Sequence, residues 1–166
     1  MTNKTKPNGK QKSIKTLRKE AKEEYIKVGE VHCPYFNEKI HFTSEGFNHL
    51  RYRKGRKERH LSVQEMRYKL LKYAKQVIEK SNTLQEHEKR NLFVEERKHK
   101  KRIKNIKKVE FFGFIAIIDN WKVKVIIRQV ENHPKHFWSV IPNWQTRKSK
   151  ERKNNFQNYT GNLSED

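Results

Sequence analysis

Apolar residues recur at helical spacing in the first half of the chain. The longest stripe follows Ser62 and predicts a helix over residues 62–80. Ser62 and Glu65 have the spacing of a capping box, which predicts where this helix begins. A shorter helix is predicted after Ser44, which is a suitable N-cap residue. The longer stripe consists of Met66, Leu70, Tyr73, Ala74, Val77 and Ile78.

The second half of the chain alternates apolar and polar residues, as strands do. FFGFIAIID, WKVKVIIRQV and HFWSVI are joined by short connections and predict an antiparallel meander. In HFWSVI, alternation places Phe137, Ser139 and Ile141 on one face and His136, Trp138 and Val140 on the other. A small hairpin is predicted in EVHCPYFNEKIHFT, with its turn at residues 34–37. The predicted fold class is α+β, with N-terminal helices packed on an antiparallel β-meander of three to five strands.

The pattern predicts one domain with loose ends. Residues 29–145 form this α+β domain, residues 1–28 a basic flexible arm, and residues 146–166 a flexible tail. Residues 81–108 are highly polar and predict a basic insertion or an exposed helix within the domain.

Charge indicates the class of partner. The chain has 40 Lys and Arg against 19 Asp and Glu, a net charge of +21. Such an excess favours a polyanion, because neutralised phosphates release counterions. An anionic membrane surface is the rival, yet no apolar run approaches the roughly 20 residues of a span. With no leader pattern and only Cys33, the expectation is a cytoplasmic protein that binds RNA, DNA or a ribonucleoprotein and no membrane.

Two groups of residues are candidates for nucleic-acid binding. The sheet offers Lys122, Lys124 and Trp138, where cations suit phosphates and an indole suits an unpaired base. The loop after His49 is predicted to bind backbone phosphates rather than to read bases. Its cations are Arg51, Arg53, Lys54, Arg56, Lys57 and Arg59.

Four residues are candidates for catalysis of RNA cleavage without a metal. The reaction needs a base for the 2′-hydroxyl proton, an acid for the leaving oxygen and cations for the charge on phosphorus. His49 and His136 suit either proton role, and Arg128 suits the phosphate. Ser139 completes the set. Each has a plainer interpretation: a helix-end or phosphate contact for His49, a strand surface residue for His136, a solvated charge for Arg128 and a structural hydroxyl for Ser139.

Other chemistry has little support in the sequence. His32, Cys33 and His41 do not match a standard zinc spacing, and Cys33 has no identifiable activating base. There is no P-loop, no dinucleotide fingerprint and no paired carboxylate arrangement. The expectation is therefore no metal and no cofactor.

The segments TSEGFNHLRYR and KVKVIIRQVENHPKHFWSVIP give the chain a resemblance to a known group. They resemble the barnase–EndoU–colicin–RelE-like (BECR) ribonucleases of toxins, phages and other mobile elements. The resemblance implies a helical part before an antiparallel sheet that cleaves RNA without metal. It implies that His49 is the helix-borne acid or base, Arg128 the strand cation, and Ser139 or His136 the polar residue of the last strand. A toxin-like nuclease would also have an inhibitor protein as a candidate partner.

Three functional hypotheses follow from the sequence. The leading one is an RNA-binding, metal-independent endoribonuclease that acts by general acid–base catalysis. The alternative is a non-catalytic basic accessory subunit of a ribonucleoprotein complex. A DNA-reading repressor is weaker, because the helix at residues 62–80 offers few groups for bidentate contacts to bases.

Overall fold

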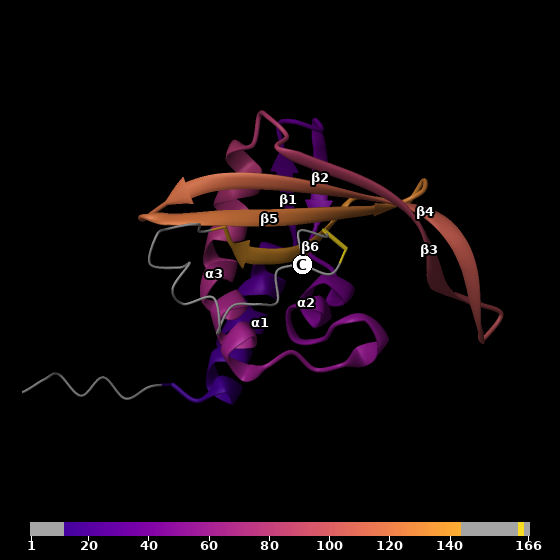
Figure 1. The fold of residues 1–166 in the computed structure, drawn as a ribbon, viewed down its shortest axis with the longest axis horizontal. Helices are drawn as coiled ribbons and strands as arrows, with labels where there is room; N and C mark the ends of the chain where they lie inside the picture. Colours follow the sequence, from indigo (N-terminus) through magenta and orange to yellow (C-terminus); the bar gives the residue numbers. More distant parts are fainter. Residues whose placement is uncertain (1–11, 144–162, 165–166) are drawn as a thin grey trace, which may run out of the picture.

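The computed structural model describes residues 12–143 and 163–164 as an α+β fold (Figure 1). In chain order its elements are α1 (Ile14–Val28), β1 (Glu30–Cys33), β2 (Glu38–His41), α2 (Ser44–Arg51), a 3₁₀ turn (Lys54–Arg56), α3 (Leu61–Lys80), β3 (Glu86–Lys98), β4 (Lys101–Ile118), β5 (Trp121–Val130) and β6 (His136–Pro142). The predicted fold class is confirmed.

The strands form one sheet in the order β1-β2-β6-β5-β4-β3. Its six strands exceed the three to five that were predicted. All neighbouring strands are antiparallel except β2 and β6, which meet in parallel at His41 and His136. The predicted hairpin at residues 34–37 is present as β1 and β2, and it extends the meander beyond β6.

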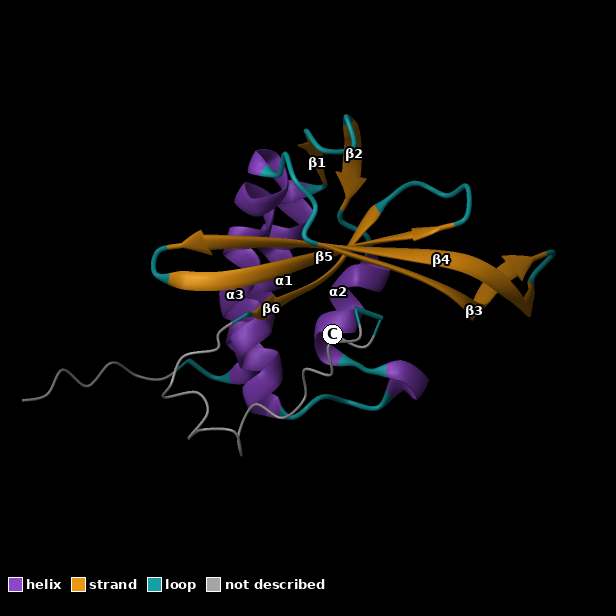
Figure 2. Cartoon of the chain, turned by 45° about the horizontal axis from the view of Figure 1, so that its top comes forward, coloured by secondary structure: helices purple, strands orange, loops and turns teal. Residues whose placement is uncertain are grey.

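α1 and α3 pack on one face of the sheet, as Figure 2 shows. The core between these layers includes Ala21 and Tyr25 of α1, although the first 28 residues were predicted to be a flexible arm. That prediction is wrong for α1, because even a narrow apolar stripe stabilises a helix when a neighbouring helix packs on it. Most of the predicted tail at 146–166 lies outside the described residues, as do residues 1–11 of the arm.

α3 confirms the helix predicted at residues 62–80 but begins differently. Its N-cap is His60, whose ring nitrogen accepts a hydrogen bond from the backbone N–H of Ser62 at 3.4 Å. The predicted capping box at Ser62 and Glu65 is therefore wrong, and Glu65 instead pairs with Lys69 at 2.6 Å. A histidine nitrogen satisfies the free amide as a hydroxyl would.

Residues 81–108, predicted as a polar insertion or exposed helix, form β3 and the first part of β4. The two strands turn at His99 and Lys100, which both have positive φ, as a two-residue hairpin turn requires. This turn lacks the Asn-Gly or Asp-Gly pair that would announce it in a sequence. The helix prediction for this segment is wrong.

An irregularity in β6 changes which side chains share a face. Ile127 pairs with Phe137 and Ile126 with Ser139, so Trp138 is the extra residue of a β-bulge. Beyond the bulge the alternation shifts by one, and Val140 joins Phe137 in the core beneath the helices. The predicted grouping of Phe137, Ser139 and Ile141 on one face is thus wrong.

Candidate functional site

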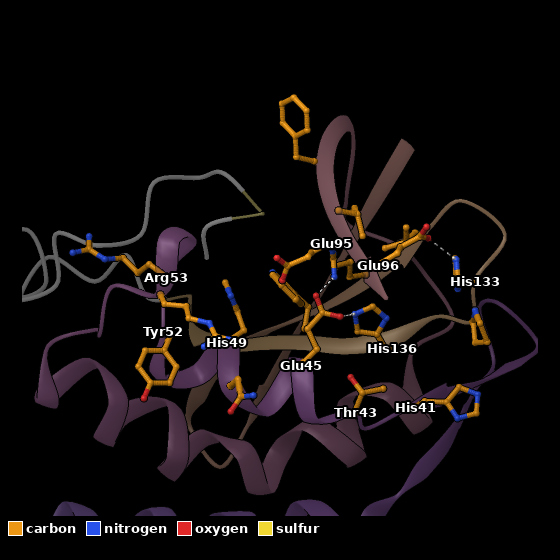
Figure 3. Close-up of a pocket in the computed structure, with 18 of the residues that line it drawn as sticks. His41, Thr43, Glu45, His49, Tyr52, Arg53, Glu95, Glu96, His133 and His136 are labelled. Atoms are coloured by element: carbon orange, nitrogen blue, oxygen red, sulfur yellow. Dashed lines mark hydrogen bonds and ion pairs between the residues drawn. The ribbon is translucent and has the colours of Figure 1, made fainter. Parts of the chain in front are cut away.

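A broad cleft of about 1170 Å³ lies between α2 with its following loop and the face of the sheet not covered by α3. Its wall includes Glu45, His49 and Arg53 on one side and Glu95 and Glu96 of β3 on the other (Figure 3). Arg128, His136 and Trp138 of β5 and β6 also line it. Side chains from three parts of the sequence therefore share one space.

Close packing fixes α2 over the start of β6. Thr43 caps the helix by accepting a hydrogen bond from the backbone N–H of Gly46 at 3.4 Å, and Tyr25 donates to the Thr43 carbonyl at 2.8 Å. A Cβ on Gly46 would lie 2.1 Å from the Phe137 carbonyl oxygen. Only glycine allows this approach, which brings Glu45 and His49, one helical turn apart, to the cleft.

An ion pair of Arg128 and Glu45 lies beside His136 at the base of the cleft. The register places Arg128 directly opposite His136. The Arg128 guanidinium donates to Glu45 Oε1, and His136 Nε2 lies 3.9 Å from Glu45 Oε2. Arg128 Nε and His136 Nε2 are buried and have no hydrogen-bond partner among the described residues. Both side chains are more than nine-tenths buried, so the group is a formed site with unused donor and acceptor capacity.

The His136 imidazole is held neutral at neutral pH. Burial lowers its pKa to about 4, and the nearby Arg128 charge acts in the same direction. The ring makes a hydrogen bond to the Pro134 carbonyl, and it must be the donor because a carbonyl can only accept. Because Nε2 has no hydrogen-bond partner, the donor is Nδ1, and Nε2 presents a lone pair towards Glu45.

His49 is fixed by Arg59 and Trp138. The Arg59 guanidinium lies 3.1 Å from His49 Nε2 and also donates to the His49 carbonyl at 3.1 Å. A guanidinium has donors only, so Nε2 accepts and the His49 proton resides on Nδ1. The His49 ring stacks on Trp138 with centroids 4.0 Å apart.

Trp138 links the two halves of the site. Besides the contact with His49, its ring lies 4.5 Å from the Arg128 guanidinium carbon in a cation–π arrangement. Its indole N–H donates to the Ser164 carbonyl at 3.3 Å. The ring already contacts two functional side chains, so it positions them and is not the open stacking plane that was predicted.

The structure separates Ser139 from the other predicted catalytic residues. Its side chain is fully buried, and its hydroxyl accepts a hydrogen bond from Arg67 of α3. It does not line the cleft. The prediction of a catalytic Ser139 is therefore wrong: the register places His136 beside Arg128, whereas Ser139 pairs with Ile126.

The predicted cations of the loop after His49 do not act as one set. Arg53 and Arg56 line the cleft, and Lys54 and Lys57 are exposed. Arg51 instead donates to Glu58 at 2.9 Å. Arg59 is buried and contacts His49, so it holds His49 in place and is not available for the phosphate contact that was predicted.

The two predicted lysines of β5 lie outside the cleft. Lys124 is buried and pairs with Glu86 at 2.9 Å, which removes it from the predicted binding set. Lys122 is exposed at the other end of the strand. It lies six positions before Arg128, about 20 Å along an extended strand.

Sequence reasoning missed Glu45. The signal was its position four residues before His49, which places both side chains on one helix face. Its partner Arg128 lies 83 residues away, so only the fold reveals the pairing.

Metal and thiol chemistry have no site among residues 12–143 and 163–164. No group of three or more His, Cys, Asp or Glu side chains there could hold a metal ion. Cys33 is fully buried, and burial raises the pKa of its thiol. No helix in the same residues is long and apolar enough to cross a membrane.

Comparison of the chain with protein-family models, with curated proteins and with solved structures finds no match. The geometry of the cleft is therefore the basis for a functional proposal.

Proposed function

We propose that the protein is an RNA-binding endoribonuclease that cleaves by general acid–base catalysis without a metal ion. The observation that carries the proposal is the convergence of His49, Arg128 and His136, with Glu45, on one cleft. These residues supply a cation, a proton acceptor and a proton donor, the three groups that the reaction needs.

Each residue has a role that follows from its contacts. Arg128 Nε, buried and without a hydrogen-bond partner, donates to a phosphate oxygen and stabilises the charge that develops on phosphorus. His136 Nε2 accepts the 2′-hydroxyl proton, and the Glu45 carboxylate 3.9 Å away stabilises the imidazolium that forms. His49 acts as the acid in its imidazolium form, which arises when Nε2 is released by Arg59 and takes up a proton. The Nδ1 proton then passes to the leaving 5′-oxygen and a neutral ring remains.

The bonds in this step balance without a further reactant. The 2′-oxygen forms a bond to phosphorus while the bond from phosphorus to the 5′-oxygen breaks. One proton leaves the 2′-hydroxyl and one reaches the 5′-oxygen, giving a 2′,3′-cyclic phosphate and a 5′-hydroxyl. DNA has no 2′-hydroxyl, so this chemistry selects RNA.

The resemblance to the BECR ribonucleases is part of the proposal. Helices that precede an antiparallel sheet, and a helix-borne histidine in the same cleft as a strand arginine, support it. The β3–β4 hairpin and the parallel contact of β2 with β6 are features of this chain that the resemblance does not imply. A toxin-like role in the cytoplasm and an inhibitor partner belong to the same proposal.

The test is incubation of the purified protein with end-labelled mixed-sequence RNA in EDTA. We expect cleavage to products ending in 2′,3′-cyclic phosphate, and a loss of about 10²- to 10⁴-fold in rate for His136→Gln and for His49→Gln. His133→Ala is the matched control, because His133 lines the same cleft yet is 60% exposed. Ser139→Ala should keep its cleavage rate per folded molecule.

A non-catalytic subunit of a ribonucleoprotein is the second candidate. It is favoured by Glu45, whose ion pair occupies Arg128 in the absence of RNA. RNA that is bound and shifted but intact after long incubation in EDTA would establish this alternative and refute the nuclease.

A further inference from the structure

The outer part of the β3–β4 hairpin extends beyond the sheet. β5 pairs with β4 only between Val109 and Ile118, so residues 91–98 and 101–108 pair with each other and with no other strand. We call these residues the ribbon. Figures 1 and 2 show it projecting away from α1 and α3. A two-stranded element without a core of its own is at best marginally stable alone, so contact with another molecule would stabilise it.

The cross-strand register divides the ribbon into two faces. One face has partly buried residues such as Leu92 and Val94, which pack on the sheet cluster of Val109 and Phe111. The other, which we call the outer face, has only exposed residues. Its members are Asn91, Phe93, Glu95, Arg97, Arg102, Lys104, Ile106 and Lys108.

The outer face combines an exposed aromatic with cations. Phe93 is 74% exposed and lies opposite Ile106, which is 63% exposed. Four cations accompany one acid, Glu95, which lies 3.9 Å from Arg102. Arg97 and Lys104 make no ion pair with any residue of the described ranges. An exposed phenylalanine has a hydration cost that binding would remove.

We propose that the outer face of the ribbon binds a single-stranded segment of RNA next to the cleft, with Phe93 stacked on a base and Arg97 and Lys104 on phosphates. An aromatic flanked by cations on a strand is the arrangement that sheets use for unpaired bases. Residues 93–96 of β3, from both faces of the ribbon, also line the cleft, so RNA bound to the outer face would pass the edge of the cleft. This inference rests on RNA as the ligand of the proposed function.

Charge argues against a second copy of the chain as the occupant. A two-fold contact would set the four cations of one outer face against the four of the other. β3 also has like-charged neighbours along this free edge, which is how natural edge strands avoid pairing. RNA uses the cations and the aromatic together.

The experiment measures affinity for a fluorescent 2′-O-methyl oligonucleotide, which binds but has no 2′-hydroxyl to react. We expect Phe93→Ala to weaken binding about 5- to 150-fold, the value of one stacked base. Lys104→Ala should lower the slope of log affinity against log salt by about 0.7, one phosphate contact to a single strand.

Matched controls are Ile117→Ala, an equally exposed apolar residue on β4 but at the other end of the sheet, and Lys80→Ala on α3. Both should bind as the unsubstituted protein does. Equal affinity and salt slope in Phe93→Ala and Lys104→Ala would overturn the proposal. The proposal would also be overturned if these two variants kept their RNA affinity but lost another interaction that the controls keep. That interaction would be self-association, measured by sedimentation, or binding to phosphatidylserine vesicles.

The failure of this proposal is distinct from the failure of the nuclease. Binding that depends on Phe93, together with intact RNA in the cleavage assay, supports the ribbon and refutes the nuclease. Cleavage of RNA by a protein whose RNA affinity does not depend on Phe93 supports the nuclease and refutes the ribbon.

Discussion

At the scale of single residues, neighbours decide what the titratable groups can do. His49 and His136 are both buried and neutral in this state, but for different reasons. A guanidinium occupies Nε2 of His49, whereas burial and a nearby arginine lower the pKa of His136. Only His136 therefore has a nitrogen lone pair without a hydrogen-bond partner in the described residues, which is the reason for assigning it as the base.

The lowered pKa of His136 makes stability depend on pH. The folded pKa is about 4 and the ordinary value is 6.5, so the unfolded chain binds the proton more readily between these values. The contribution is fully present above about pH 6.5 and is lost as pH falls towards 4, on the order of 3 kcal/mol in all. Denaturant titrations from pH 7 to pH 4 should show this slope.

His136→Gln is the comparison for that titration, because glutamine does not ionise. A slope that is unchanged in this variant would show that another group causes it.

At the scale of elements, α2 is positioned by backbone contact as much as by side chains. Gly46 lies against the Phe137 carbonyl, and Tyr25 from α1 holds the first turn of the helix. A shift of α2 would move Glu45 and His49 together, away from Arg128 and Trp138. The site thus depends on a short helix that contributes only Phe47 and Leu50 to the hydrophobic core.

Gly46→Ala should therefore be strongly destabilising. The added Cβ would overlap the Phe137 carbonyl oxygen and the Tyr25 hydroxyl, at 2.1 and 2.7 Å. We expect a loss of at least about 1–3 kcal/mol in the free energy of unfolding, the range for overpacking. Thermal or denaturant unfolding measures it. Ser44→Ala, an exposed change in the same helix, is the control, and equal stability of the two variants would contradict this account of α2.

At the scale of the whole molecule, two described residues near the end of the chain reach the site. Leu163 is buried with Val109, Phe111 and Ile126 on the sheet, and its N–H donates to Glu88 at 2.9 Å. The neighbouring Ser164 carbonyl accepts from Trp138. These contacts lie behind the ring that holds His49 and Arg128.

Leu163→Ala should loosen this contact without unfolding the domain. Loss of a buried leucine side chain costs about 2–5 kcal/mol. Here the cost lowers the free energy with which residues 163 and 164 bind the sheet, and it leaves the rest of the domain folded. We expect faster hydrogen exchange of the Trp138 indole N–H and a nearly unchanged global unfolding midpoint. Nuclear magnetic resonance of the indole signals measures the exchange, with Trp121 as the internal reference. Unaltered exchange would mean that Leu163 does not hold Trp138.

The sequence by itself determined the parts of this protein whose signals are local. Alternation and helical spacing predicted α3, the first hairpin and strands β4 to β6, and charge predicted a polyanion partner. His49, His136 and Arg128 were identified as residue types suited to one reaction, and the structure brings them to one cleft.

Only the tertiary structure decided the features that depend on partners distant in sequence. The ribbon has few apolar residues and no standard turn pair, so its strands are recognisable only from their pairing with each other. Glu45 acquires its role from Arg128. Ser139 loses its predicted role because the register pairs it with Ile126 and its hydroxyl accepts from Arg67 of α3, outside the cleft. A register is set by contacts between strands, and no spacing within one strand contains that information.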